Sequence, residues 1–181
     1  MSKYLVCSDI HGEIENFREA LLQELPLDGV LIAGDLELRT GEIESVIWEA
    51  VQETDPSAST IPPSYIVAGN NDGWTAPELP KKIITKLEGH TIFLCHGHRF
   101  GVPRLNTLWV QAKKAGADIA IFGHTHRYQD AEHFGVRFLN PGKLGYNFSG
   151  LRSTYMILTF LPDGSVNAEK RFLPERPDPY F

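Results

Sequence analysis

Two histidines one residue apart follow an apolar run in the segment IFGHTH, residues 121–126. If this run is a β-strand that continues in extended form, side chains at positions i and i+2 point the same way, so His124 and His126 would present two nitrogen ligands to one place. A polar turn with two exposed histidines is the alternative for this segment alone. Imidazole nitrogens bind divalent transition metals, so the rest of the sequence has to decide between the two.

Four other apolar runs are also followed by groups that can bind a metal. They are Asp9 and His11 after YLVCS, Asp35 after GVLIAG, Asn70 after SYIVAG, and His96 and His98 after TIFLC. Each has an ordinary explanation when taken singly, because Ser and Asp are good helix N-caps and Gly-Asp or Gly-Asn-Asn-Asp sequences form turns. Five strand ends that all carry such groups are not expected by chance and together predict a metal site.

The types of these groups indicate which metal they would hold. Mixed carboxylate, amide and imidazole donors suit divalent Mn, Fe, Co, Ni or Zn better than an all-oxygen Ca or Mg site. The two cysteines, Cys7 and Cys95, each end an apolar run, where a buried free thiol is expected rather than a disulfide or a zinc thiolate.

The hydrophobic pattern predicts the elements that would position these groups. The five runs are almost continuously apolar, as strands buried on both faces require, and the carboxyl ends of parallel strands meet at one edge of a sheet. Apolar residues at helical spacing predict helices over residues 13–25, 42–53 and 105–115, and further strands are expected within 136–140, 154–161 and 165–173. We therefore predict an α/β fold, a four-layer αββα sandwich of two mixed β-sheets flanked by helices.

Size and composition agree with a globular protein. The chain has 181 residues, of which 42% are apolar and 22% charged, and we expect one domain over residues 1–181. No apolar run approaches the roughly 20 residues of a membrane helix, and the N-terminus does not resemble a signal peptide, so we expect no membrane contact and a cytoplasmic location. The net charge of −6 provides no general attraction to nucleic acid, and an anionic substrate would need a local positive centre such as a bound metal.

Six segments carry a resemblance to a known family. They are SDIHG at 8–12, AGD at 33–35, GNND at 69–72, CHGHRFG at 95–101, FGHTH at 122–126 and NPGKLG at 140–145. As an ordered set they resemble the motifs of the calcineurin-like metallophosphoesterases, in particular the small YfcE/Vps29-like phosphodiesterase subgroup. The resemblance covers most of the chain.

This resemblance implies a dinuclear metal centre and a reaction. Asp9, His11 and His126 would hold one ion, Asn70, His96 and His124 the other, and Asp35 would bridge the two. The implied activity is hydrolysis of a small phosphoester, preferably a phosphodiester, by in-line attack of a metal-bridging hydroxide at phosphorus. Manganese is the expected metal, with Ni, Fe, Co or Zn as alternatives, and Asp35, Asn70, His96 and His98 are the implied catalytic residues.

The chain departs from the family pattern at Asn71. Many members have a histidine there that protonates the leaving oxygen, which an amide cannot do, so we hypothesise that esters with acidic leaving groups are cleaved best. Asp72 could orient Asn70 or Asn71, or only stabilise the turn. His98 could contact substrate or form a hydrogen bond within its loop. Further candidates are Arg99, Arg127 and Lys143 for phosphate contacts, and Trp74 and Tyr128 for the walls of a cleft.

The resemblance also leaves other functions open. One is a Vps29-like scaffold for protein interactions with weak or no catalysis, although all seven ligand positions carry ligand-type residues here. Another is a phosphomonoesterase or nucleotidase. Homo-oligomerisation is a further possibility, and the proline-rich end of the chain, LPERPDPYF, could cover a sheet edge, meet a partner or remain mobile.

Overall fold

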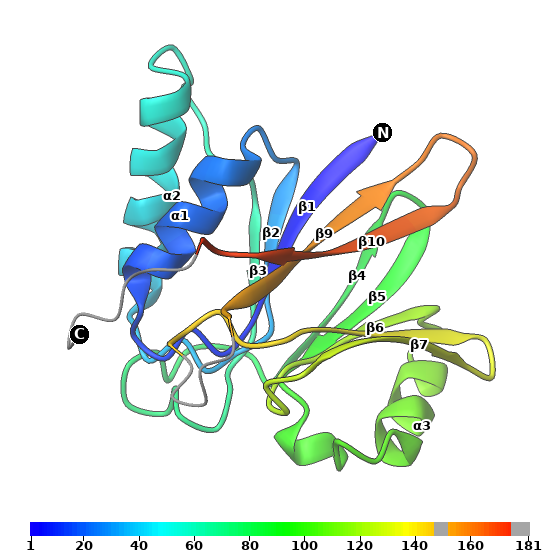
Figure 1. The fold of residues 1–181 in the computed structure, drawn as a ribbon. Helices are drawn as coiled ribbons and strands as arrows, with labels where there is room; N and C mark the ends of the chain where they lie inside the picture. The colour runs from blue at the N-terminus through cyan, green and yellow to red at the C-terminus, as the bar shows by residue number, and fades with distance from the viewer. Residues whose placement is uncertain (147–151, 175–181) are drawn as a thin grey trace.

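The computed structural model describes residues 1–146 and 152–174, which form two five-stranded mixed β-sheets (Figure 1). The first sheet has the strand order β10-β9-β1-β2-β3, and the second has the order β4-β5-β6-β8-β7. The first sheet contains β1 (Ser2–Cys7), β2 (Gly29–Ile32), β3 (Ser64–Ile66), β9 (Thr154–Phe160) and β10 (Val166–Phe172). The second contains β4 (Lys82–Leu87), β5 (His90–Cys95), β6 (Ile119–Ile121), β7 (Tyr128–His133) and β8 (Val136–Pro141).

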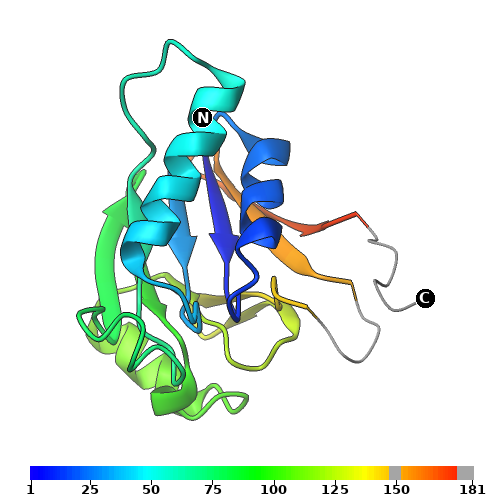
Figure 2. The ribbon, with the colours of Figure 1, turned by 90° about the vertical axis from the view of Figure 1, so that its left-hand side faces the viewer.

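Helices cover the outer faces of both sheets. Helices α1 (Ile14–Glu24) and α2 (Thr40–Thr54) lie side by side over the first sheet, as Figure 2 shows. Helix α3 (Asn106–Lys114) packs against β6 and β8 of the second sheet, and a short 3-10 helix, His98–Phe100, precedes it. The predicted αββα sandwich is therefore confirmed, and each predicted helix is present to within two residues at either end.

Alternation of side chains along the strands explains the layers. In β1, Leu5 and Cys7 pack toward α1 and α2, whereas Tyr4 and Val6 pack between the two sheets. In β5, Phe93 packs toward α3 while its neighbours enter the core between the sheets. Each fully buried aliphatic or aromatic side chain contributes about 1.5–3 kcal/mol to folding. Burial on both faces is why these strands are nearly continuously apolar.

Parallel pairing places the strand ends that carry polar motifs at one edge. Strands β1, β2 and β3 are mutually parallel in the first sheet, and β5, β6 and β8 are parallel in the second. The loops that follow β1, β2, β5 and β6 gather at the lower edge of the molecule in Figure 1. The predicted convergence of the loops is therefore confirmed, and it rests on the registers within each sheet.

Two strands were not predicted. Strands β4 and β7 form the edges of the second sheet and consist mostly of exposed and half-buried residues, and their sequences KIITKL and YQDAEH contain no continuous apolar run. An edge strand needs only one ladder of partners and tolerates such polarity. The expectation for the C-terminus is tested only at its start, where Leu173 is buried in the core beneath α1 and α2, because residues 175–181 lie outside the described part.

Two smaller expectations concern the cysteines and the membrane. Cys7 and Cys95 are free and buried, as predicted, and burial raises the pKa of both thiols well above the ordinary range. Within residues 1–146 and 152–174, the structure contains no helix of the length and apolarity that a membrane crossing demands.

Candidate metal centre

The loops that follow the strands turn sharply through left-handed backbone conformations. Asp9, His11, Asp35, Glu37, His124 and His126 all have positive φ, between 49° and 68°. In a residue with a side chain this conformation costs roughly 1–2 kcal/mol, and it persists only where surrounding contacts hold it. Backbone strain in this molecule is thus concentrated in the loops that carry the predicted ligands.

This geometry corrects the argument made for His124 and His126. Strand β6 ends at Ile121, and both histidines are in the left-handed region rather than in an extended segment. Their side chains consequently meet different neighbours: His126 Nε2 lies 3.1 Å from Asp9 Oδ1, whereas the ring of His124 faces that of His96 with centroids 5.2 Å apart. The expectation that both rings point to one place because the strand continues is wrong.

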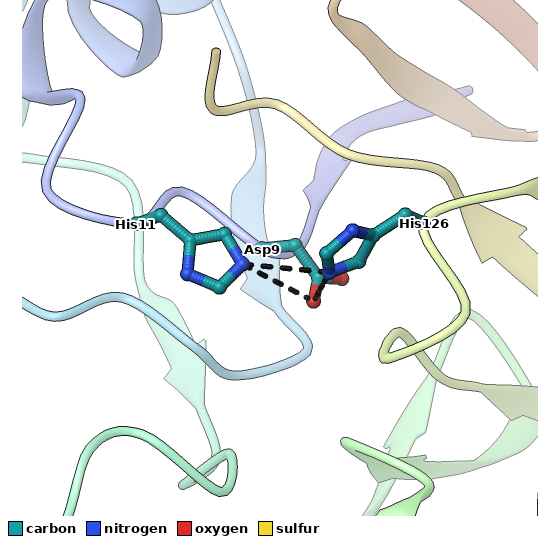
Figure 3. Close-up of side chains that lie close together, drawn as sticks. All are labelled: Asp9, His11 and His126. Carbon is teal, nitrogen blue, oxygen red and sulfur yellow. Dashed lines mark hydrogen bonds and ion pairs between the residues drawn. The ribbon is translucent and has the colours of Figure 1, made fainter. Parts of the chain in front are cut away.

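Asp9, His11 and His126 form the first cluster of potential ligands (Figure 3). The Nε2 atoms of the two histidines are 3.4 Å apart, and Asp9 Oδ1 lies 3.9 Å from that of His11. Asp9 is fully buried, whereas His11 and His126 are partly exposed. The cluster therefore joins a buried carboxylate to two imidazoles that solvent can reach.

The two oxygens of Asp9 differ in a way that tests whether a cation fits. Oδ2 accepts hydrogen bonds from Ser8 Oγ at 2.6 Å and from the backbone N–H of His124 at 3.1 Å. Oδ1 is buried and accepts no hydrogen bond from the described residues, yet it faces the two imidazole nitrogens. A buried carboxylate oxygen without a donor is costly, and a positive ion would satisfy it. These residues fit a divalent metal.

The second cluster consists of Asp35 and His96 together with Asp9, so Asp9 belongs to both clusters. His96 Nε2 lies 3.4 Å from Asp35 Oδ2 and 3.2 Å from Asn70 Oδ1. The other ring nitrogen, Nδ1, is 2.7 Å from the carbonyl oxygen of Ala33 and must donate to it. That bond leaves the Nε2 lone pair of neutral His96 facing the carboxylates, as a metal ligand requires.

The charge state of this pair follows from its contacts. Burial alone would raise the pKa of Asp35, but the contact with His96 and the hydrogen bond from the backbone of Asn71 lower it to about 2. Burial opposes protonation of His96, yet the contact with Asp35 and the charge of Asp9 raise the pKa of His96 above its ordinary value. Burial and then the charge of His96 lower the pKa values of His98 and His124.

Asn71 and Asp72 hold the loops that carry Asp35. Asn71 donates to both oxygens of Asp35, from its backbone N–H at 2.9 Å and from its side-chain amide at 3.0 Å. The buried carboxylate of Asp72 accepts from the backbone N–H groups of Asp35, Glu37 and Gly69, at 2.8, 2.9 and 2.7 Å respectively. Asp72 therefore stabilises its own turn and also joins the loop after β3 to the loop after β2.

The NPGKLG segment supports the histidine loop from the other side. Asn140 is buried and donates from its amide to the carbonyl of Gly123 at 2.9 Å and to Thr125 Oγ1 at 3.1 Å. The backbone N–H of Gly145 donates to the carbonyl of Asp9 at 2.9 Å. This motif thus positions loops that carry predicted ligands without supplying one.

The remaining candidates lie at different distances from these clusters. The ring of His98 is 5.4 Å from that of His96 and 6.1 Å from that of His124, measured between centroids. Its buried Nδ1 has no hydrogen-bond partner among the described residues, so a loop hydrogen bond at that atom is not found. Arg99 and Arg127 are exposed and Lys143 is half-buried, and their contact with phosphate stays a prediction.

The two aromatic candidates, Tyr128 and Trp74, differ in their surroundings. Tyr128 packs against the core between the sheets, which is the packing role that sequence reasoning weighed against a cleft wall. Trp74 is 98% exposed and has no such role.

Sequence reasoning missed Glu37, whose carboxylate lies 2.6 Å from His11 Nδ1. The only signal in the sequence was an acidic residue two positions after Asp35.

A four-layer sandwich whose parallel strand ends bring carboxylates and imidazoles together is the arrangement expected of a metallophosphoesterase. A model of the calcineurin-like phosphoesterase superfamily domain matches residues 3–162, and the chain belongs to this family. The chain is 26% identical over 164 residues to the probable metallophosphoesterase YsnB of Bacillus subtilis, which covers 90% of this chain and 86% of YsnB.

Solved structures show the same fold. Vacuolar protein sorting 29 from Cryptosporidium parvum superposes with a TM-score of 0.70 at 22% identity, covering 96% of this chain and 98% of that one. A novel archaeal phosphodiesterase superposes with a TM-score of 0.65 at 22% identity, covering 93% of this chain and 99% of that one. The likeness thus extends both to a sorting protein and to an enzyme.

Proposed function

We propose that this protein is a metal-dependent phosphodiesterase. Asp9, His11 and His126 would hold one divalent ion, Asn70, His96 and His124 a second, and Asp35 would contact both. The observation that carries the proposal is the buried Oδ1 atom of Asp9, which lacks a hydrogen-bond donor among the described residues and faces two imidazole nitrogens. Family membership and the likeness to an archaeal phosphodiesterase support it.

The charges of the site suit an anionic ester. Asp9 and Asp35 bring about two negative charges, and two divalent ions would leave the centre positive although the whole chain carries −6. Such a pair of ions supplies an activated water near neutral pH and neutralises charge on the phosphoryl group. The partly exposed His11 and His126 leave one side of the centre open to solvent, where a substrate can approach.

Asn71 limits the acid chemistry of the site. Its side-chain amide donates to Asp35 Oδ2 and its backbone N–H to Asp35 Oδ1, so both groups fix the carboxylate that would lie between the ions. An amide has no proton to give to a leaving oxygen near neutral pH. The leaving group must therefore depart largely unassisted by this residue, which favours esters of acidic alcohols such as aryl diesters.

The test is hydrolysis of bis-p-nitrophenyl phosphate together with metal analysis. We expect turnover to disappear when a chelator removes the metal and to return with Mn, Ni or Co. Asp35→Asn should lose more activity than the roughly 10- to 100-fold that removal of an outer partner of a ligand costs. The exposed variant Glu49→Gln, on α2, is the control and should retain full activity. Protein that binds no metal and shows no turnover with any of these ions would contradict the proposal.

A protein-interaction scaffold is the second candidate, and two observations favour it. The fold is shared with vacuolar protein sorting 29. An apolar pocket beside α3 is lined by Pro103, Leu105, Trp109, Val110 and Phe134, and Phe134 is 84% exposed. Absence of both metal and turnover in the assay above would favour this function. A rate with p-nitrophenyl phosphate higher than the rate with the diester would indicate a phosphomonoesterase instead of a phosphodiesterase. The cytoplasmic location and homo-oligomerisation stay predictions.

A further inference from the structure

The carboxylate of Glu37 lies against the outer edge of His11. Glu37 Oε1 is 2.6 Å from His11 Nδ1, while the opposite nitrogen of the same ring, Nε2, faces Asp9 and His126. Figure 3 shows this ring with one nitrogen directed at the cluster and the other directed away from it. Glu37 therefore contacts the potential ligand from the side that a metal would not occupy.

This contact determines where the proton of neutral His11 resides. An ionised carboxylate only accepts hydrogen bonds, so a contact of 2.6 Å requires the hydrogen on Nδ1. A neutral imidazole carries one such hydrogen, and the lone pair is then left on Nε2, where Asp9 and His126 are. Histidine ligands whose other ring nitrogen donates to a carboxylate are held in one orientation and bind metals more tightly.

The backbone holds Glu37 in this position at some cost. Glu37 has a φ of 55° and His11 has a φ of 49°, so both ends of the contact are in the left-handed region. The N–H of Glu37 donates to Asp72 Oδ1 at 2.9 Å, and the N–H of His11 donates to the carbonyl of Asp35 at 3.0 Å. The bond from His11 joins the loops after β1 and β2, and the bond from Glu37 joins the loops after β2 and β3, so together they set the two side chains beside each other. Strain maintained on both partners suggests a functional role.

We propose that Glu37 is a positioning residue that fixes the tautomer and ring orientation of His11 and thereby raises metal affinity at the cluster of Asp9, His11 and His126. The ligand geometry of His96, in the second cluster, does not depend on Glu37, because the carbonyl oxygen of Ala33 accepts the hydrogen bond from His96 Nδ1 and fixes its tautomer. The inference rests on the proposed metal site. Glu37 would thus affect the ion held by Asp9, His11 and His126 and not the ion held through His96.

Metal titration of chelator-stripped protein tests the proposal. For Glu37→Ala, calorimetry with Mn or Zn should show one of two equivalents bound about 10- to 100-fold more weakly and the other unchanged. Glu37→Gln should fall between this variant and the wild type, since its amide oxygen still accepts from Nδ1 but carries no charge. The control is Glu53→Ala, which removes an exposed ion pair with Arg18 on the helical side and should leave both equivalents unchanged.

A second readout does not require metal at all. Nitrogen-15 NMR of the metal-free protein, with His11 assigned through a His11→Asn variant, should show the hydrogen on Nδ1 in the wild type and a shift toward the Nε2 form in Glu37→Ala. Equal weakening of both equivalents, or an unchanged tautomer, would overturn the role of Glu37. A wild-type protein that binds no metal would instead end the proposed function, and the tautomer measurement would still decide whether Glu37 positions His11.

Discussion

Removal of the Asp72 carboxylate is the sharpest test of how the site is assembled. Asp72→Ala leaves the N–H groups of Asp35, Glu37 and Gly69 without their acceptor, and of these three bonds the one to Asp35 is buried and the other two are part-buried. An unsatisfied buried donor costs about 1–3 kcal/mol. Water can reach the two part-buried N–H groups, so they add less than this each, and we expect a total loss of about 3 kcal/mol. In Asp72→Asn, one oxygen can still serve Asp35 and Gly69, while the amide faces the N–H of Glu37, so a loss of about 1–3 kcal/mol is expected.

Urea unfolding in the presence of a chelator measures this effect without a contribution from metal binding. The exposed variant Glu49→Gln serves as the control and should stay within about 0.5 kcal/mol of the wild type. Because the two loops carry Asp35 and Asn70, metal affinity of both Asp72 variants should fall in the same order as stability. If Asp72→Ala unfolded at the same urea concentration as the wild type, the loops would have to be joined by other contacts.

Three further predictions concern activity and pH. Across aryl phosphodiesters the rate should fall as the pKa of the leaving phenol rises, because Asn71 cannot donate a proton, and a flat series would contradict this. In metal-free protein, the raised pKa of His96 adds stability that is full below about pH 6.5 and is lost as pH rises through the higher pKa of the folded state. The lowered pKa of Asp35 adds stability that is full above about pH 4 and is lost as pH falls toward about 2. Asp35→Asn should therefore reduce both pH dependences of the melting temperature, measured with chelator present. Trp74→Ala should leave the melting temperature unchanged and raise KM for aryl diesters by about fivefold relative to alkyl diesters, since the exposed ring can stack on an aryl group with about 1 kcal/mol.

The parts of this molecule that could be predicted are those that local sequence determines. Buried parallel strands must be apolar along their whole length, so β1, β2, β5 and β6 are visible as runs, and the polar residues that end them lie where parallel strands bring them together. Strands β4 and β7 were missed because they lie at sheet edges and their sequences contain no continuous apolar run. The edge strands β3 and β10 of the first sheet were predicted all the same, so an edge position alone does not hide a strand.

Glu37 and the backbone of the loops were beyond sequence reasoning for a related reason. Glu37 meets His11 across 26 positions of sequence, and the contact depends on the register between β1 and β2 and on hydrogen bonds between their loops. In the sequence, GDLELR gives only one more acidic residue in a polar loop. Left-handed conformations at non-glycine residues are likewise imposed by tertiary contacts rather than by local preference.

The glycines of two motifs show how closely the ligand loops approach each other. A Cβ on Gly123 would lie 1.8 Å from Ser8 Oγ and 2.8 Å from Asp9 Oδ2, and one on Gly69 would lie 2.0 Å from Asp35 Oδ1. Both glycines are thus needed because the strand end of another segment occupies the space of a side chain: the Ser8 hydroxyl with the Asp9 carboxylate at Gly123, and the Asp35 carboxylate at Gly69. Motifs far apart in sequence are therefore parts of one packed unit, in which the glycine of one segment makes room for the acidic residue of another.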